Sequence, residues 1–376
     1  MRIITNRKTG KYKIKILPEE ISSVSIVIPQ YSENEHVILS CLAMIDSQVF
    51  MDFSKIEVII INDYSSIILS EEFLNQFNNI KPIYMKLKEP SGPGLARQVG
   101  LDIAKNDYIY FHDADDMLFG NNSLFSLLYH AQNYDIISGN VMIETEDKGL
   151  IEINNGISNV EVWGKVYRRE FLIKNNIRFS EDPVFRWMSE DVYFNVLCNT
   201  YNPKKKHVDI LAYVYKYNKN SLMRTINNHP EKMNFGYLAE IKAAERNPDP
   251  FTITCFFKEM YEDILEKKKK KISYEEDQKC LNIFFKKFKH LIIAIDKLTE
   301  EEMRYFRKIK RVYYEPSPFS IAGFFQKKWV GKLESYINLI KNYNGTKGME
   351  EAIKYLCIQI QKQGGSEIIN IESKRT

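Results

Sequence analysis

Two clusters of carboxylates have the residue types and the spacing to do chemistry. Asp113 and Asp115 form a D-x-D sequence, and an extended backbone would point both side chains to the same side. Two such carboxylates repel each other unless a cation lies between them, and oxygen ligands suit Mg²⁺ or Mn²⁺. Glu190 and Asp191 form the second cluster and could supply a general base. Either cluster alone also fits a simpler role, as a solvated turn or as the cap of a helix.

Apolar segments place the first cluster at the edge of a sheet. Short apolar runs predict buried strands at Val24–Pro29, Val58–Ile61, Ile83–Leu87 and Tyr108–Phe111. Helical stripes of apolar residues occupy 36–47 and 94–104, between these strands. The alternation predicts an open α/β sheet with right-handed crossovers. Ligands of such sheets bind beyond the carboxyl ends of the strands, and Asp63 and Asp113 lie at two of those ends.

The sequence changes character near residue 230. Proline and glycine become sparse beyond this point, and the patterns are mainly helical. We therefore divide the chain into an α/β domain over residues 1–230 and a helical domain over residues 231–376. The lysine run Lys267–Lys271 is expected on a solvated helix face, although clustered lysines also suit contact with an anionic membrane surface.

Composition narrows the class of protein. Of 376 residues, 44% are hydrophobic and 27% are charged, which is typical of a globular chain and excludes a disordered or fibrous one. A formal net charge of +4 gives no sign of a nucleic-acid partner. Five cysteines without a C-x-x-C pair argue against a disulfide framework or a zinc site. The cysteine pattern favours a reducing compartment. The sequence shows neither a typical signal peptide nor a run of about 18 apolar residues, so we expect no transmembrane helix.

Five motifs together resemble one family. In chain order they are VSIVIPQY (Val24–Tyr31), EVIIINDYS (Glu57–Ser65), GLARQ (Gly94–Gln98), YIYFHDADD (Tyr108–Asp116) and SEDVYF (Ser189–Phe194). Their order and spacing resemble the family 2 glycosyltransferases of GT-A type, and the matched motifs span residues 24–225. The resemblance implies a GT-A fold, which is Rossmann-like with a mostly parallel sheet, followed here by the mainly helical C-terminal domain.

The resemblance also implies roles for individual residues. It makes Asp191, with Glu190 before it, similar to the catalytic base motif, and Asp115 similar to the direct metal ligand, with Asp113 near the ribose or the metal. Asp63 is similar to the aspartate that hydrogen-bonds uracil. The positions that would contact the nucleotide sugar are Pro29, Tyr31, Glu33, Asp63, Arg97, Asp113, Trp163 and Arg224.

Some of these positions keep a second interpretation. Trp163 would stack on a sugar face or lie in the core, and Arg224 or Lys219 would clamp phosphate oxygens or belong to a solvated basic loop. The chain also departs from the family's pattern. Asn62 stands where an aspartate is common, and Tyr64 where glycine is usual, which would reshape the nucleotide pocket.

The implied activity is transfer of a sugar, with inversion, from a nucleotide sugar to a hydroxyl acceptor. UDP-sugar is the expected donor, Mn²⁺ or Mg²⁺ the expected cofactor, and a glycan or a lipid-linked molecule the expected acceptor. The setting that the family implies is bacterial surface glycan assembly, in the cytoplasm or at the inner face of the cell membrane. The helical domain would bind acceptor, approach the membrane or form a homo-oligomer.

Two other functions stay open at this stage. A sugar-phosphate nucleotidyltransferase also uses a metal and an α/β sheet, but its glycine-rich N-terminal loop is replaced here by Gln30–Glu33. A non-catalytic nucleotide- or glycan-binding protein would have lost the carboxylates, whereas Asp115 and Asp191 are intact. The sequence does not reveal the donor sugar, the acceptor, the linkage or the oligomeric state.

Overall fold

A computed structural model describes residues 2–5, 12–15, 21–146, 149–153, 160–218, 233–271, 273–292 and 299–300. The chain divides into two compact units. The first takes Met1–Gly156, Glu161–Asp191 and Pro203–Ser221, and the second takes Ile157–Val160, Val192–Asn202 and Leu222–Thr376. Among the helices of the described ranges, none combines the length and the apolar character that crossing a membrane would need.

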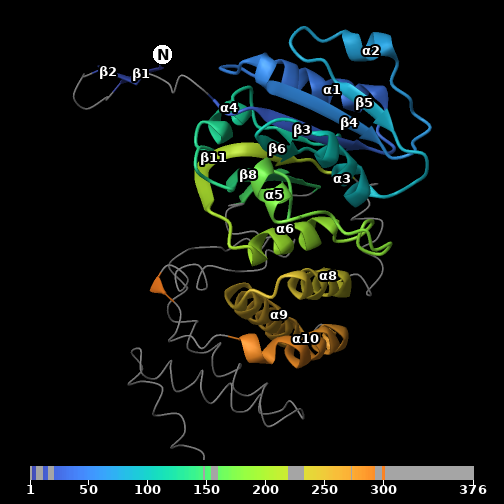
Figure 1. The fold of residues 1–376 in the computed structure, drawn as a ribbon, viewed down its shortest axis with the longest axis vertical. Coiled ribbons are helices and arrows are strands. Elements are labelled where there is room, and N and C mark those ends of the chain that lie inside the picture. Colours follow the sequence, from blue (N-terminus) through green and yellow to red (C-terminus); the bar gives the residue numbers. More distant parts are fainter. Residues whose placement is uncertain are drawn as a thin grey trace, which may run out of the picture. The chain divides into compact units, whose positions relative to one another are not determined.

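The first unit is built on a nine-stranded mixed sheet, shown in Figure 1. Its strands are β3 (Val24–Gln30), β4 (Ile56–Asn62), β5 (Ile83–Lys86), β6 (Tyr108–Phe111), β7 (Met117–Leu118), β8 (Ile136–Thr145), β9 (Gly149–Ile153), β10 (Lys165–Arg168) and β11 (Lys205–Tyr215). The strand order is β5-β4-β3-β6-β10-β8-β11-β7, and β9 pairs with β8. Strands β5, β4, β3 and β6 are parallel, while β10 runs antiparallel to β6 and to β8.

Helices cover both faces of this sheet because the strands are apolar on both sides. Alternate residues of β3 face different helices. Ile26 and Ile28 share a core with the buried residues of α1 (Glu35–Asp46) and α4 (Ser123–Leu128). On the other face, α3 (Pro93–Ile103) approaches so closely that a Cβ on Gly100 would lie 2.3 Å from a methyl of Val27. This contact sets the position of α3, and therefore of Arg97, against the sheet.

The remaining elements of this unit include short helices, and the first of them begins at a capping serine. The side chain of Ser70 accepts a hydrogen bond from the amide of Phe73 and caps α2 (Glu71–Asn75). A short helix, α5 (Arg169–Lys174), follows later in this unit, and α6 (Glu190–Thr200) begins in it and continues into the second unit. A separate antiparallel pair, β1 (Arg2–Thr5) with β2 (Tyr12–Lys15), stands at the start of the chain.

The second unit contains α8 (Met233–Arg246), α9 (Pro250–Lys270) and α10 (Glu275–Phe288), followed by a short 3₁₀ helix (Lys289–Leu291). Its core is aromatic, with the rings of Phe257 and Phe285 5.8 Å apart between α9 and α10. The expectation for the lysine run is wrong at its first member. Lys267 is buried because Asp277 and Asp263 both pair with it, whereas Lys270 and Lys271 are exposed.

The predicted fold class is confirmed, and so are the four strands and two helices expected in the first 111 residues. The strand or turn and the short helix expected between Trp163 and Asn176 are β10 and α5. The two-residue strand β7 was not expected, because it is too short to show a periodic pattern. The domain boundary near residue 230 stays a prediction. Residues 219–232 lie outside the described ranges, as does the greater part of the chain beyond residue 292.

Candidate active site

The parallel strands bring the predicted acidic residues to one edge of the sheet. β4 and β6 flank β3 and run in its direction, so Asp63 and Asp113 follow carboxyl ends on the two sides of β3, at the same edge of the sheet. The amide of Asp63 donates to Gln30 O at 2.7 Å, and the amide of His112 donates to Val27 O at 3.0 Å. These bonds extend the ladder past the strand ends and fix where each acidic loop starts.

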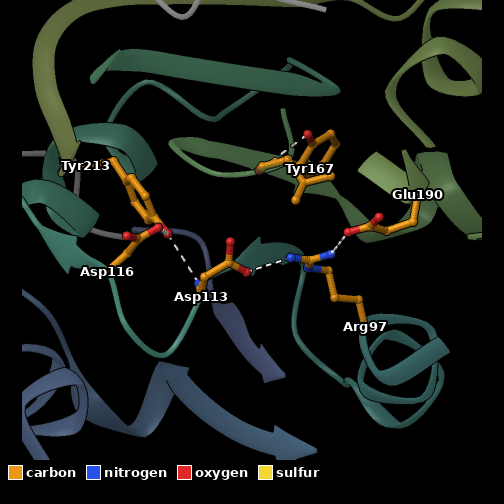
Figure 2. A network of polar contacts seen from close by, with 7 residues as sticks. Arg97, Asp113, Asp116, Tyr167, Glu190 and Tyr213 are labelled. Carbon is orange, nitrogen blue, oxygen red and sulfur yellow. Dashed lines mark hydrogen bonds and ion pairs between the residues drawn. The ribbon is translucent and has the colours of Figure 1, made fainter. Parts of the chain in front are cut away.

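Arg97 joins the two acidic clusters, as Figure 2 shows. Its Nη2 donates to Asp113 Oδ1 at 2.6 Å and its Nη1 to Glu190 Oε1 at 2.7 Å. The Arg97 side chain is 6% exposed, against 24% for Asp113 and 12% for Glu190. Although burial opposes the charge, Asp113 and Glu190 raise the pKa of Arg97. One fixed cation therefore holds the D-x-D segment and the E-D segment together.

Glu190 reaches Arg97 because the backbone around it is unusual. Ser189 has a left-handed φ of 57°, immediately before α6 begins at Glu190. Gly94 leaves room for this segment, since a Cβ there would lie 2.9 Å from the Cβ of Glu190 and 3.0 Å from Arg186 O. Burial, followed by the neighbouring charge of Asp191, raises the pKa of Glu190 to about 7, although Arg97 opposes the rise. A carboxyl group with this pKa suits proton transfer near neutral pH.

The D-x-D loop carries more negative charge than its surroundings neutralise. Burial raises the pKa of Asp115, and the charge of Asp113 adds to that rise, while a hydrogen bond from Asn218 Nδ2 at 2.9 Å opposes it. Burial also raises the pKa of Glu33, with smaller contributions from Asp115 and Asp113. Asp116 behaves in the same way, its pKa raised by burial and then by Asp113 and Asp115.

This charge fits a divalent cation. Within the described ranges, no group of three or more His, Cys, Asp or Glu side chains is arranged to hold a metal by itself. Mg²⁺ commonly binds one or two carboxylates and completes its shell with substrate phosphates and water. Asp115 supplies such a carboxylate, and Asp113 supplies a second whose Oδ1 already binds Arg97. The residues present therefore fit a cation shared with a diphosphate.

The predicted base-binding position is organised by backbone amides. Asp63 is buried, and its two carboxylate oxygens accept hydrogen bonds from the amides of Ser91 at 2.7 Å and Gly92 at 2.8 Å. Burial nevertheless raises its pKa. Each oxygen keeps a second lone pair, so the carboxylate can still accept from a ligand. Tyr64 has a left-handed φ of 60° at the position where the family usually has glycine, and its side chain is half exposed.

Asn62 has a structural task that explains the departure from aspartate. Its amide nitrogen donates to Tyr84 Oη at 2.7 Å and to Ile67 O at 2.9 Å. Its amide oxygen accepts from the amide of Ser65 at 2.6 Å. A carboxylate could not donate the first two bonds, so asparagine is the residue that closes this loop.

The remaining predicted contact residues lie in different surroundings. Tyr31 is exposed, and its amide donates to Glu33 Oε2 at 2.7 Å, while Pro29 is partly buried on β3. Trp163 is 5% exposed and lies parallel to the ring of Tyr213, with centroids 5.5 Å apart. Asp191 stands next to Glu190 in the first turn of α6. Arg224 and Lys219 fall outside the described residues.

Sequence reasoning missed the residues that support the D-x-D loop from β11. Tyr213 is fully buried, and its hydroxyl donates to Asp116 Oδ2 at 2.7 Å. Asp116 was visible as a third carboxylate, but nothing in the sequence pairs it with a strand residue 97 positions later. His112 is buried between Tyr110 and Tyr213, and burial lowers its pKa to about 4, so it is neutral at pH 7.

Comparison with known proteins finds similarity to glycosyltransferases. Residues 25–195 match the family described as glycosyl transferase family 2. An uncharacterized glycosyltransferase of Bacillus subtilis, EpsJ, is 29% identical over 229 residues, covering 54% of this chain and 63% of that protein. The poly(ribitol-phosphate) beta-N-acetylglucosaminyltransferase TarP of Staphylococcus aureus is 26% identical over 194 residues, covering 47% of this chain and 57% of TarP. The match thus spans less than two thirds of either relative.

Among solved structures, S. aureus TarS 1-349 in complex with UDP-GlcNAc covers 91% of both chains at 15% identity, with a TM-score of 0.49. The family match rests on residues 25–195, the segment that contains the sheet edge, the D-x-D loop and Glu190. In these residues the chain is similar to glycosyl transferase family 2.

Proposed function

We propose that this chain is a metal-dependent, inverting glycosyltransferase that moves a sugar from a UDP-sugar to a hydroxyl group. The observation that carries the proposal is the Arg97 bridge, which joins the D-x-D and E-D segments inside the family 2 domain. The relatives support the setting: TarP is named for transfer of N-acetylglucosamine to poly(ribitol phosphate). Assembly of a bacterial surface glycan, in the cytoplasm or at the membrane's inner face, is the corresponding role for this chain.

Each segment then has a task on the donor side. Asp63 would accept a hydrogen bond from the base, with Tyr31, Pro29 and Glu33 beside it. Asp115 and Asp113 would hold the divalent cation, which, when bound, neutralises charge on the departing diphosphate. Arg97, which is fixed by two carboxylates, keeps Asp113 in place for this task.

The acceptor side requires a base. A sugar hydroxyl is a poor nucleophile near neutral pH, so a carboxylate must take its proton during attack on the anomeric carbon. We assign this step to Asp191, which stands in the first turn of α6 at the position that resembles the family's catalytic base, while Glu190 before it binds Arg97. A single displacement with one base inverts the anomeric configuration.

Calorimetric titration of UDP with and without Mn²⁺ tests the donor side. The wild-type protein should bind UDP more tightly with Mn²⁺, and Asp115→Ala should lose most of that gain. If Asp115→Ala keeps the full gain in UDP affinity with Mn²⁺, then Asp115 is not a metal ligand. The same Kd with and without metal in the wild-type protein would overturn metal dependence.

Hydrolysis of a UDP-sugar and transfer to a hydroxyl acceptor test the chemistry. Asp191→Asn should bind UDP normally and lower the rate by about 10²–10⁴-fold, as removal of a general base does. Glu190→Gln is the matched variant at the adjacent position. If Glu190→Gln alone abolishes turnover, then Glu190 is the base. A wild-type protein that binds UDP but hydrolyses and transfers nothing would be a binding protein instead.

A further inference from the structure

We propose that the end of β11 is a cradle that positions the D-x-D loop, with Tyr213 as its central positioning residue. This inference rests on the proposed function, because it concerns how Asp113 and Asp115 are presented to a cation and a diphosphate. The cradle consists of Tyr213, Lys216 and Asn218, which lie on β11 and directly after it.

Tyr213 contacts the loop at both of its ends. Its hydroxyl accepts a hydrogen bond from the amide of Asp113 at 3.3 Å and donates one to Asp116 Oδ2 at 2.7 Å, as Figure 2 shows. The amide of Asp116 in turn donates to Asp113 O at 3.1 Å, which closes the loop on itself. A single buried hydroxyl thus fixes the residues on either side of Asp115.

Two further bonds from the same strand end hold the loop. The amide of Lys216 donates to Asp116 Oδ1 at 2.8 Å, so both oxygens of this carboxylate are engaged. Asn218 Nδ2 donates to Asp115 Oδ2 at 2.9 Å and orients the carboxylate that we assign to the cation. Strand β7 pairs with β11 immediately after the loop, with Leu118 opposite Tyr213, and prevents the strand end from sliding.

The ring of Tyr213 is itself immobilised. It is fully buried, lies within 6° of parallel to Trp163, and meets His112 edge-on with centroids 5.2 Å apart. A hydroxyl on a locked ring is a fixed reference point, and outer partners of this kind set the orientation of metal ligands. Trp163 therefore contributes to the site by stacking on Tyr213 and holding its ring in place, a role that does not require contact with the sugar.

Tyr213→Phe tests the cradle, because it removes the hydroxyl and keeps the ring stacked on Trp163. Tyr167→Phe is the matched control: Tyr167 is also fully buried in the same sheet, but its hydroxyl donates to Val162 O. Amide hydrogen exchange of residues 113–116, without ligand, should be faster in Tyr213→Phe by roughly fivefold or more, as expected from loss of one hydrogen bond. Tyr167→Phe should leave the exchange of these residues unchanged.

The second measurement is the affinity for UDP at a series of Mn²⁺ concentrations. In Tyr213→Phe, the Mn²⁺ concentration that gives half of the increase in UDP affinity should rise by about 10–100-fold. This is the usual consequence of losing an outer partner of a metal ligand. UDP affinity without metal should not change. Asn218→Ala, which leaves the buried rings intact, should shift the metal requirement in the same direction and covers the case in which Tyr213→Phe does not fold.

The outcomes separate the cradle from the proposed function. Unchanged exchange in Tyr213→Phe, or faster exchange with an unchanged metal requirement, overturns the cradle. A wild-type protein that binds UDP without any metal effect overturns metal dependence instead, and the exchange measurement alone then decides whether Tyr213 anchors the loop.

Discussion

Two regions of the molecule use the same device, one buried cation between two carboxylates, for different ends. In the α/β unit Arg97 binds Asp113 and Glu190. In the helical unit Lys267 binds Asp277 and lies 3.6 Å from Asp263. Each cluster places one buried cation against two carboxylates, so the charges alone do not reveal which cluster does chemistry.

Exposure and excess charge distinguish them. The Lys267 cluster is closed, because its carboxylates are at most 7% exposed and the hydroxyl of Tyr237 also donates to Asp263. In the Arg97 cluster, Asp113 is 24% exposed, and burial together with the charge of Asp113 raises the pKa of Asp115 and of Asp116 beside it. A balanced, enclosed cluster holds helices together, whereas an acidic cluster with an open side is prepared to receive a cation. Substitutions in the two clusters test this difference between them.

Arg97→Met should have the largest effect. It leaves two carboxylates without their cation, and breaking a buried pair in this way destabilises a protein by about 3–5 kcal/mol. It should also abolish sugar transfer, because Asp113 loses the bond that fixes it. Urea unfolding and a transfer assay measure the two losses. Arg178→Met is the control, since Arg178 forms a paired bond with Asp102 at 2.8–2.9 Å that is largely exposed, and a surface pair contributes only about 0.2–1 kcal/mol.

Lys267→Met should have a comparable effect on stability and none on donor binding. The two aspartates again lose their cation, so the free energy of unfolding should fall by about 3–5 kcal/mol. The UDP affinity of the folded variant should equal that of the wild-type protein. Lys279→Met, which removes an exposed pair with Glu276 on α10, should stay within about 1 kcal/mol. A loss of UDP affinity in folded Lys267→Met would refute the division of labour between the two clusters.

Glu190→Gln should change the pH dependence of stability, a smaller effect. The pKa of Glu190 is about 7 in the folded protein, against an ordinary value of 4.5. Between these values the folded state holds a proton that the unfolded state has lost, so this group lowers stability as pH rises from 4.5 to 7. In Glu190→Gln this contribution to the pH dependence of stability is absent. Its stability relative to the wild-type protein should therefore increase with pH across this window and become constant above it.

Urea unfolding at several pH values between 4.5 and 8.5 measures this difference. Parallel curves for Glu190→Gln and the wild-type protein would show that Arg97 keeps Glu190 ionised throughout the range. In that case Glu190 would resemble the carboxylates of the Lys267 cluster, which are paired with a buried cation.

The sequence by itself determined the elements and the edge at which the acidic residues gather. Runs such as Val58–Ile61 are apolar on both sides, which only a covered strand tolerates, and parallel strands bring Asp63 and Asp113 to one edge. The D-x-D spacing and the order of the motifs then indicated the family. These patterns are formed by residues that are close together in the chain, so they can be recognised from the sequence alone.

Only the tertiary structure decided which charges meet. Arg97 and Glu190 are 93 positions apart, and Tyr213 and Asp116 are 97 apart, so no spacing rule connects either pair. The same limit applies to Lys267. It belongs to a lysine run that the sequence predicts to be solvent-exposed, and nothing in the sequence indicates that it is buried against Asp277. Such partners are set by how closely α3 approaches the sheet and where β11 ends. Long-range packing fixes both, and it leaves no periodic trace in the sequence.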